Sequence, residues 1–204
     1  CTLVHRWLKG SKAKIDRHMA TLIACGVTAD SAHFLIANDS TFELMAEMLR
    51  ISGKRFSVIL GLLNVEKDFS QKIATLKAAK RSRIFKMGDF IAVVAEVGAF
   101  ESDAANALVK VGADVAFAGN NENRELKISA RASQRIVKNA GLDLAKDVFQ
   151  PLSSFFTGSG GGHSGAAGFN GINANPQQVM LKCIELCRKK LSKSGLKAQL
   201  KEYT

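Results

Sequence analysis

A glycine run in the last quarter of the chain constrains the fold more than any other stretch. Residues 158–168 read GSGGGHSGAAG. Without Cβ atoms the backbone can adopt positive φ and bring successive N–H groups close to a ligand. We expect a loop that leads into a short helix over residues 164–167, with its N–H groups aimed at an anion, most naturally a phosphate. His163, at the junction, could donate a hydrogen bond to a phosphate oxygen.

The alternative for the same run is a flexible linker, since glycine-rich stretches commonly connect domains. Two features argue against it. The run is short, and a single His163 is followed within a few residues by the apolar sequence AAGF, whereas linkers usually continue in serine, glycine and charge. The run is not a Rossmann or P-loop fingerprint either, because no Lys-Ser/Thr pair ends it.

A second candidate for anion binding lies about 30 residues earlier. Residues 126–131 alternate apolar and polar side chains, which predicts a half-buried strand. Ser129 and Arg131 lie two residues apart, so a hydroxyl and a guanidinium point to the same face. The planar guanidinium can bind a phosphate through two hydrogen bonds. The alternative is an edge strand with a solvated arginine.

These two elements carry a resemblance to a known family. The sequence GGGHSGAAGF of residues 160–169 resembles the GGGHxxAAGF motif of the DHHA1 domain, the C-terminal substrate-binding domain of DHH-family phosphoesterases. That family includes RecJ-type exonucleases, nanoRNases and cyclic-dinucleotide phosphodiesterases, and the domain recurs in alanyl-tRNA synthetase. Residues 129–133 resemble the S-x-R-S element, whose arginine contacts substrate phosphate. The resemblance implies substrate binding by Ser129, Arg131, Gly160, Gly161, Gly162 and His163.

The N-terminal region carries a weaker part of the same resemblance. Residues 20–34 are similar to the last motif of the DHH catalytic domain, a helix running into G-I-x-x-D-T/S-x-x-F, and Asp30 takes the position of a manganese ligand. From spacing alone, Asp30 would cap a helix or close a turn. A hard divalent ion needs oxygen and imidazole donors from several segments. The motifs that supply them, including the DHH triplet, are absent, so no catalytic set is complete.

Asp16-Arg17-His18 only superficially matches that triplet, and we interpret it as solvated helix surface. The resemblance therefore implies Mn²⁺, or Mg²⁺, in a longer parent protein, and this chain is not expected to retain the metal. The chain would be the C-terminal portion of such an enzyme.

The resemblance and the local patterns together give a domain organisation. Residues 1–40 would be a remnant of the α/β catalytic domain, residues 41–83 a helical connector, and residues 84–204 a DHHA1 domain. The expected fold class is α/β, a small mixed β-sheet flanked by helices.

Local signals give the elements. Helices are predicted over residues 1–9, over 16–25 with Gly26 closing the helix, over 41–50 after the capping pair Asp39-Ser40, and over 66–83. Residues 56–63 are apolar with ambiguous periodicity. Strands at 83–86 and 90–97 should form a hairpin around Gly88, and a helix should follow at 101–112. A strand at 114–118, a polar turn at 120–123, helices within 134–157, a strand at 169–172 and a helix at 177–191 complete the pattern.

The composition and charge of the chain indicate which classes of partner to expect. The chain has 204 residues, 47% of them hydrophobic, which is enough to bury a substantial core. A formal net charge of +11 favours an anionic partner, nucleic acid before membrane, although a solvated basic surface is the alternative. No apolar run reaches the roughly 18 residues of a membrane span, and no signal peptide is recognisable, so we expect a cytoplasmic protein. Cys1, Cys25, Cys183 and Cys187 form no CxxC pair and are expected as buried reduced thiols.

The resemblance implies that the parent enzyme is a RecJ-like, manganese-dependent hydrolase of phosphodiester bonds, such as an exonuclease. This piece is then expected to bind nucleic acid or nucleotide phosphates without cleaving them. A non-catalytic nucleic-acid-binding module and a degenerate family member are the alternatives. The sequence leaves open whether the substrate is DNA, RNA, a dinucleotide, a nucleotide phosphate or polyphosphate, and it leaves the oligomeric state open.

Overall fold

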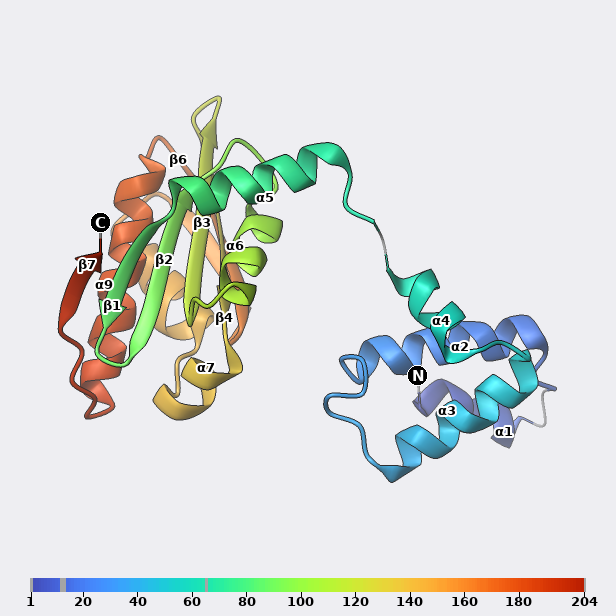
Figure 1. The fold of residues 1–204 in the computed structure, drawn as a ribbon. Helices are drawn as coiled ribbons and strands as arrows, with labels where there is room; N and C mark the ends of the chain where they lie inside the picture. Colours follow the sequence, from blue (N-terminus) through green and yellow to red (C-terminus); the bar gives the residue numbers. More distant parts are fainter. Residues whose placement is uncertain (1, 12–13, 65, 204) are drawn as a thin grey trace. The chain divides into compact units, whose positions relative to one another are not determined.

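The computed structural model describes residues 2–11, 14–64 and 66–203. Its contacts divide the chain into two compact units, Cys1–Glu66 and Lys67–Thr204 (Figure 1). The division falls inside the stretch 41–83 that we interpret as a connector. The first part of that stretch packs within the first unit, and the rest packs within the second.

The first unit is helical and consists of α1 (Thr2–Gly10), α2 (Arg17–Asp30), α3 (Asp39–Ser52) and α4 (Phe56–Leu63). Its core gathers buried aliphatic side chains from all four helices, among them Leu8, Val27, Met48 and Ile59. The apolar stretch with ambiguous periodicity is therefore helix α4.

The start of α2 is as predicted, but its end is not. Asp16 caps the helix by accepting a hydrogen bond from the backbone N–H of Met19 at 2.8 Å. The helix continues through Gly26 to Asp30. Val27 and Thr28 are buried in the core, and this packing outweighs the roughly 1 kcal/mol that a glycine costs inside a helix. Asp30 therefore lies in the last helical turn, where we had expected a polar turn after the helix.

Helix α3 begins two residues before its predicted start and ends at the predicted Gly53. The N-cap is Asn38, which forms a capping box with Thr41, and Asp39 is the first helical residue. Gly53 ends the helix in the left-handed conformation, with φ of 68°.

The second unit is built around one mixed seven-stranded sheet with the strand order β5-β6-β4-β3-β2-β1-β7 (Figure 1). The strands β2 and β3 run parallel, and the remaining neighbours run antiparallel. The strands are β1 (Arg83–Met87), β2 (Phe90–Glu96), β3 (Val115–Glu122), β4 (Glu125–Ala132), β5 (Gly158–His163), β6 (Ala166–Ile172) and β7 (Leu200–Tyr203). The helices are α5 (Phe69–Arg81), α6 (Glu101–Lys110), α7 (Gln134–Ala140), the π-helix η1 (Leu144–Phe149), α8 (Gln150–Leu152) and α9 (Pro176–Lys193). The predicted fold class, a mixed sheet flanked by helices, is confirmed.

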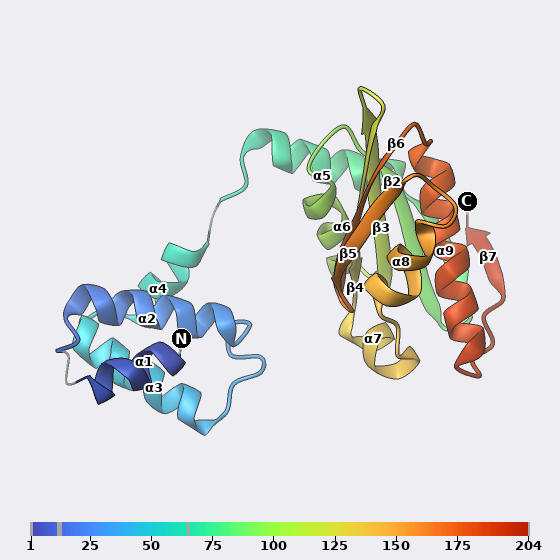
Figure 2. The ribbon, with the colours of Figure 1, turned by 180° about the vertical axis from the view of Figure 1, so that it is seen from behind.

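Helices cover both faces of this sheet (Figure 2). On one face α9 and η1 pack over a core that contains Phe117, Phe149 and Phe169, with Phe149 between the other two rings. On the other face α6 packs closely through small side chains, because Ala104 meets a sheet surface made of alanine and valine. The alanine-rich face brings α6 near the backbone of β3 and β4.

Two hairpins show how local chemistry sets the strand boundaries. Gly88 turns the β1–β2 hairpin with φ of 62°, as predicted. The predicted polar turn at 120–123 is mostly strand, because Asn120 and Asn121 pair with β4. The chain reverses later, at Asn123 and Arg124, which have φ of 52° and 70°.

The glycine run forms a structure that we did not predict. It is strand β5, which turns at residues 164–165 and pairs with β6, so the expected loop and short helix are wrong. The physical reason is that Ala167 and Phe169 of β6 are buried and need a paired neighbour strand. The short C-terminal strand β7 was also missed, since its sequence LKEY carries little apolar signal.

The cysteines behave as core residues where the structure describes them. Cys183 and Cys187 of α9 are buried, and desolvation raises the pKa of both thiols. Thiolate formation is thereby suppressed, so these groups are poor nucleophiles. Cys25 is half-buried, and Cys1 lies outside the described residues. Among the described residues, no helix is both long enough and apolar enough to cross a membrane.

Asp114 holds the start of β3 in place. Its carboxylate accepts hydrogen bonds from the backbone N–H of Ile91 at 2.9 Å and from Arg135 Nη1 at 2.9 and 3.0 Å. The Ser133 hydroxyl also donates to it, at 3.2 Å. The Asp114 side chain is only 8% exposed, so these partners are not easily replaced by water.

Asp114→Ala should lower the free energy of unfolding by about 2–3 kcal/mol, because the Ile91 N–H, the Ser133 hydroxyl and Arg135 lose a charged acceptor. Urea denaturation measures this loss. Asp103→Ala is the matched control, since the Asp103–Lys67 ion pair is partly exposed and worth less than about 1 kcal/mol. Equal losses in the two variants would contradict the role given to Asp114.

Candidate phosphate-binding site

The strands β4, β6 and β5 bring the predicted site residues onto one face of the sheet. In the register, Ser129 lies opposite Gly168, which lies opposite Gly161. The next row joins Arg131, Ala166 and His163 in the same way. Directly paired residues on adjacent strands share a face, as do residues two apart on one strand. We call the surface formed by these two rows the glycine platform: Ser129, Gly168, Gly161, Arg131, Ala166 and His163.

The floor of the glycine platform is open. A Cβ atom added at Gly161 would have no neighbour within 4 Å, and one at Gly168 would meet only the Ile128 carbonyl oxygen, at 3.3 Å. Among the described residues, no side chain therefore comes within 4 Å of either Cβ position. A ligand can approach the main chain here more closely than it could over any other residue type.

The three glycines of the motif have different roles. A Cβ at Gly160 would lie 2.7 Å from Cβ of Phe149, and Gly162 has a φ of 141° with Ala167 close by. Both positions point to the face that carries η1, where packing demands glycine. Of the three, Gly161 is the one that opens onto the glycine platform.

Arg131 is held in place by two hydrogen bonds. Its Nη1 donates to the Ala130 carbonyl at 2.8 Å, and its Nη2 donates to the Ser102 hydroxyl in the first turn of α6 at 2.6 Å. A guanidinium carries five N–H donors, so these bonds position the group without exhausting it. The arginine is half-buried, which reduces the solvent screening of its charge.

His163 lies at the other end of the same row. It is exposed, at the end of β5, and two strand spacings separate it from Arg131, which corresponds to about 10 Å between backbones. Both side chains start from the same face of the sheet. Strand β5 is the edge of the sheet, and one side of its backbone faces away from β6 (Figure 2).

A third row extends the platform with polar residues that we did not predict as functional. Asn120, Lys127, Asn170 and Ser159 lie opposite one another on β3, β4, β6 and β5. The last three line a cavity of about 450 Å³. In β4, the strict alternation that exposes Lys127 together with Ser129 and Arg131 was the available signal. Nothing in the sequence showed that Asn170 and Ser159 would lie beside them.

Asn120 is the buried member of that row. Its Nδ2 donates to the Gly98 carbonyl at 3.0 Å, while its Oδ1 is buried and has no hydrogen-bond partner among the described residues. The row therefore ends at Asn120 Oδ1, a buried acceptor that lowers the stability of the fold unless a donor binds it.

Asp30, the predicted metal ligand, belongs to the first unit. It is exposed at the end of α2, and the chain then makes a left-handed turn through Ala32, His33 and Phe34, with φ of 50°, 56° and 70°. Such residues cost roughly 1–2 kcal/mol each. The turn is held by a hydrogen bond from the His33 N–H to the Thr28 carbonyl and by stacking of the Phe34 ring on a neighbouring phenylalanine.

The residues around Asp30 do not fit a divalent ion by themselves. Over residues 2–11, 14–64 and 66–203, no group of three or more histidine, cysteine or acidic side chains is placed to hold a metal. A single exposed carboxylate cannot complete the coordination shell of Mn²⁺ or Mg²⁺. The role of Asp30 as a ligand stays a prediction.

Comparisons with known proteins bear on the fold. No family model matches the chain. Over 188 residues the chain is 30% identical to an uncharacterized protein of Methanocaldococcus jannaschii, an alignment that covers 90% of this chain and 56% of that protein. The solved structure of an exopolyphosphatase-related protein from Bacteroides fragilis matches with a TM-score of 0.65 at 14% identity, covering 89% of this chain and 53% of that one.

The chain shares its fold with this exopolyphosphatase-related protein. A pGpG-specific phosphodiesterase from Vibrio cholerae also aligns, with a TM-score of 0.41 and 11% identity over 95% of this chain and 68% of that one. The chain spans about half the length of the archaeal relative and of the Bacteroides protein. The fold shared with the Bacteroides protein agrees with the resemblance read from the two motifs.

The different roles of the motif glycines can be separated by stability. Gly160→Ala should lower the free energy of unfolding by about 1–3 kcal/mol, because the new methyl group meets Phe149. Gly161→Ala should be neutral or stabilising by up to about 1 kcal/mol, because the methyl group enters open space. Thermal and urea denaturation of the two variants measure the difference. Equal destabilisation by Gly160→Ala and Gly161→Ala would contradict the open space above Gly161.

Proposed function

We propose that this chain is the substrate-binding portion of a phosphoesterase that hydrolyses phosphodiester bonds in nucleic acid or oligonucleotides. One observation carries the proposal. A guanidinium, a hydroxyl and an imidazole lie on one face of the sheet, beside Gly161 and Gly168, where no side chain of the described residues comes within 4 Å of an added Cβ. Arg131 would bind a phosphate through its planar fork, and Ser129 and His163 would donate to the remaining oxygens. Gly161 would let the phosphate reach the main chain.

Charge supports a nucleic acid or oligonucleotide as the substrate. The net charge of +11 favours anionic ligands, and a ligand with several phosphates gains from it more than one with a single phosphate. The fold neighbour from Bacteroides is described as exopolyphosphatase-related, which also fits a phosphate-containing substrate. The third polar row, with Lys127 and Asn170, offers contacts beyond a single phosphate.

The hydrolytic metal site would require protein beyond this chain. We propose Mn²⁺, or Mg²⁺, as the ion and Asp30 as one of its ligands in the longer parent. The first unit exposes large apolar side chains, which supports its packing against further protein: Leu3, Val4, Trp7, Leu22, Leu35 and Ile36. In this proposal residues 1–40 are part of a catalytic domain and residues 84–204 are the DHHA1 domain.

A non-catalytic nucleic-acid-binding module is the second candidate. It is favoured by the single carboxylate at Asp30, which has no metal-binding cluster around it in the described ranges. A degenerate member of the family would also have a single carboxylate at this position without a complete set of metal ligands. In both alternatives the glycine platform still binds phosphate. They differ from the proposed phosphoesterase only in lacking a working catalytic domain.

The role of the Arg131 fork can be tested without changing charge. Arg131→Lys should weaken binding of a linear dinucleotide about ten-fold or more, because an ammonium cannot reproduce two parallel hydrogen bonds. Isothermal titration calorimetry measures the affinity. Arg17→Lys, an exposed change at the start of α2, is the control and should have no effect. An unchanged affinity in Arg131→Lys would contradict the proposed binding site.

The chain should bind substrate but not hydrolyse it. With Mn²⁺ added, the 204-residue chain should release no mononucleotide from a dinucleotide or short oligonucleotide, because one carboxylate cannot hold the ion. Chromatography of the reaction mixture with and without EDTA measures this. Metal-dependent hydrolysis would contradict the incomplete metal site.

A further inference from the structure

The edge of the sheet opposite the glycine platform carries a second basic and aromatic surface. Strand β7 pairs with β1 there, so that Lys201 lies opposite Lys86 and Tyr203 lies opposite Ile84 (Figure 1). Ile91 of β2 lies opposite Lys86 on the other side. These five residues share the face of the sheet on which α5 and α6 pack. We call them the β1–β7 patch.

The β1–β7 patch is exposed although half of it is apolar. Ile84, Ile91 and Tyr203 keep 42%, 41% and 49% of their surfaces accessible. The alternate residues of β1, such as Phe85 and Met87, are buried in the core under α9. The outer face of this edge therefore displays a contiguous apolar and aromatic strip on a rigid sheet.

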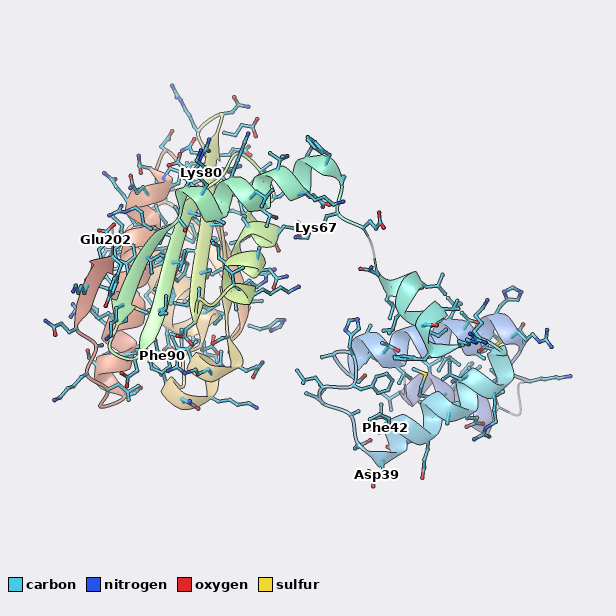
Figure 3. The ribbon with its side chains drawn as sticks, in the orientation of Figure 1. Asp39, Phe42, Lys67, Lys80, Phe90 and Glu202 are labelled. Atoms are coloured by element: carbon cyan, nitrogen blue, oxygen red, sulfur yellow. The ribbon has the colours of Figure 1, made fainter. Side chains whose placement is uncertain are left out.

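The two lysines lie where charge repulsion works against the fold. Like charges directly opposite each other on neighbouring strands are destabilising. The acidic residue of β7 is Glu202 (labelled in Figure 3). It alternates with Lys201 and Tyr203, so it points to the other face, where Arg83 donates two hydrogen bonds to it at 2.7 and 2.9 Å. It therefore does not neutralise Lys86 and Lys201. An anionic ligand would remove the cost of this pairing.

Two cavities meet at the patch. One, of about 460 Å³, is lined by Ile84, Ile91, Phe90 and Tyr203 together with Lys86 and Asp89. The other, of about 710 Å³, adds Lys197, Gln199 and Lys201 and shares Lys86 and Tyr203 with the first. An aromatic and aliphatic pocket is thus continuous with a basic one.

We propose that the β1–β7 patch binds single-stranded nucleic acid. Phosphates would bind Lys86, Lys197 and Lys201, and a base would stack on Tyr203 above the two isoleucines. Proteins that bind single strands combine basic grooves with aromatic side chains in this way. Lys201 Nζ lies 5.2 Å from the centre of the Tyr203 ring, so a phosphate on this lysine places the adjoining base within reach of the ring. Asp89 can accept a hydrogen bond from a base amino group.

This surface is independent of the glycine platform. Six strand spacings separate β7 from β5, which corresponds to about 29 Å, and α5 and α6 cover strands in between. The proposal does not rest on hydrolysis or on Arg131. It predicts a preference for chains of several nucleotides over mononucleotides.

The test is fluorescence anisotropy of a labelled single-stranded DNA of about 12 nucleotides with the full chain, over a series of salt concentrations. The double variant Lys86→Gln/Lys201→Gln should weaken binding and reduce the slope of log K against log salt by about 1.4, since each neutralised phosphate contributes roughly 0.7. Tyr203→Ala should weaken binding about five- to a hundred-fold through lost stacking.

The control Lys72→Gln/Lys138→Gln removes the same charge from exposed positions on α5 and α7, and it should leave affinity and slope nearly unchanged. The midpoint of thermal unfolding of the Lys86→Gln/Lys201→Gln variant should hold or rise, because the like-charge pair is gone. A fall in that midpoint would count against the proposal. Arg131→Lys, assayed with a mononucleotide, reports on the glycine platform separately.

Besides a fall in that midpoint, three results would overturn the proposal. The first is unchanged DNA affinity in both the double-lysine variant and Tyr203→Ala. The second is an equal loss in the control variant, which would reduce the effect to net charge. The third is a dimer, seen by sedimentation, that Tyr203→Ala dissociates while DNA affinity is unchanged, because the patch would then be a contact between two copies of the chain.

Discussion

The antiparallel pairing of β4, β6 and β5 is the interaction on which the candidate site depends. It places Arg131 and His163 in one row and Ser129 and Gly161 in the next, although the two motifs are separated by about 30 residues of chain. Backbone hydrogen bonds between strands fix these positions more firmly than a loop would. The site is therefore preorganised before a ligand arrives, which reduces the free-energy cost of ordering it on binding.

The sequence predicted the fold class and the main elements well where local signals were strong. Gly53 and Gly88 marked turns, and the alternation of residues 126–131 marked β4. It failed where tertiary contacts decide. Gly26 was expected to end a helix, but burial of Val27 and Thr28 carries α2 onward. The glycine run was expected as a loop because glycine permits positive φ and a close approach of backbone N–H groups to a ligand. The buried Ala167 and Phe169 on the neighbouring strand explain why β5 forms instead.

The candidate site was predicted in composition but not in geometry. The residue types of the two motifs indicated anion binding, and the register shows that they share a face. The anions were expected at the N-terminus of a helix, whereas they would meet a sheet surface bordered by the first turn of α6, where Ser102 positions Arg131. Neither the third polar row nor the β1–β7 patch could be found from sequence, because each joins strands that are distant along the chain.

The packing of β5 also explains how a strand with almost no side chains keeps its pairing register with β6. Strands rich in glycine slip easily, because they have few side chains whose burial would be lost in a shift. In this fold Phe149 of η1 lies against Gly160, and the ring of Phe169 lies close to both Gly158 and Gly160. A slip of one residue in either direction would push the Ser159 hydroxymethyl group toward these rings. The rings thus fix the register of β5 by steric exclusion, and attraction between side chains is not needed for this.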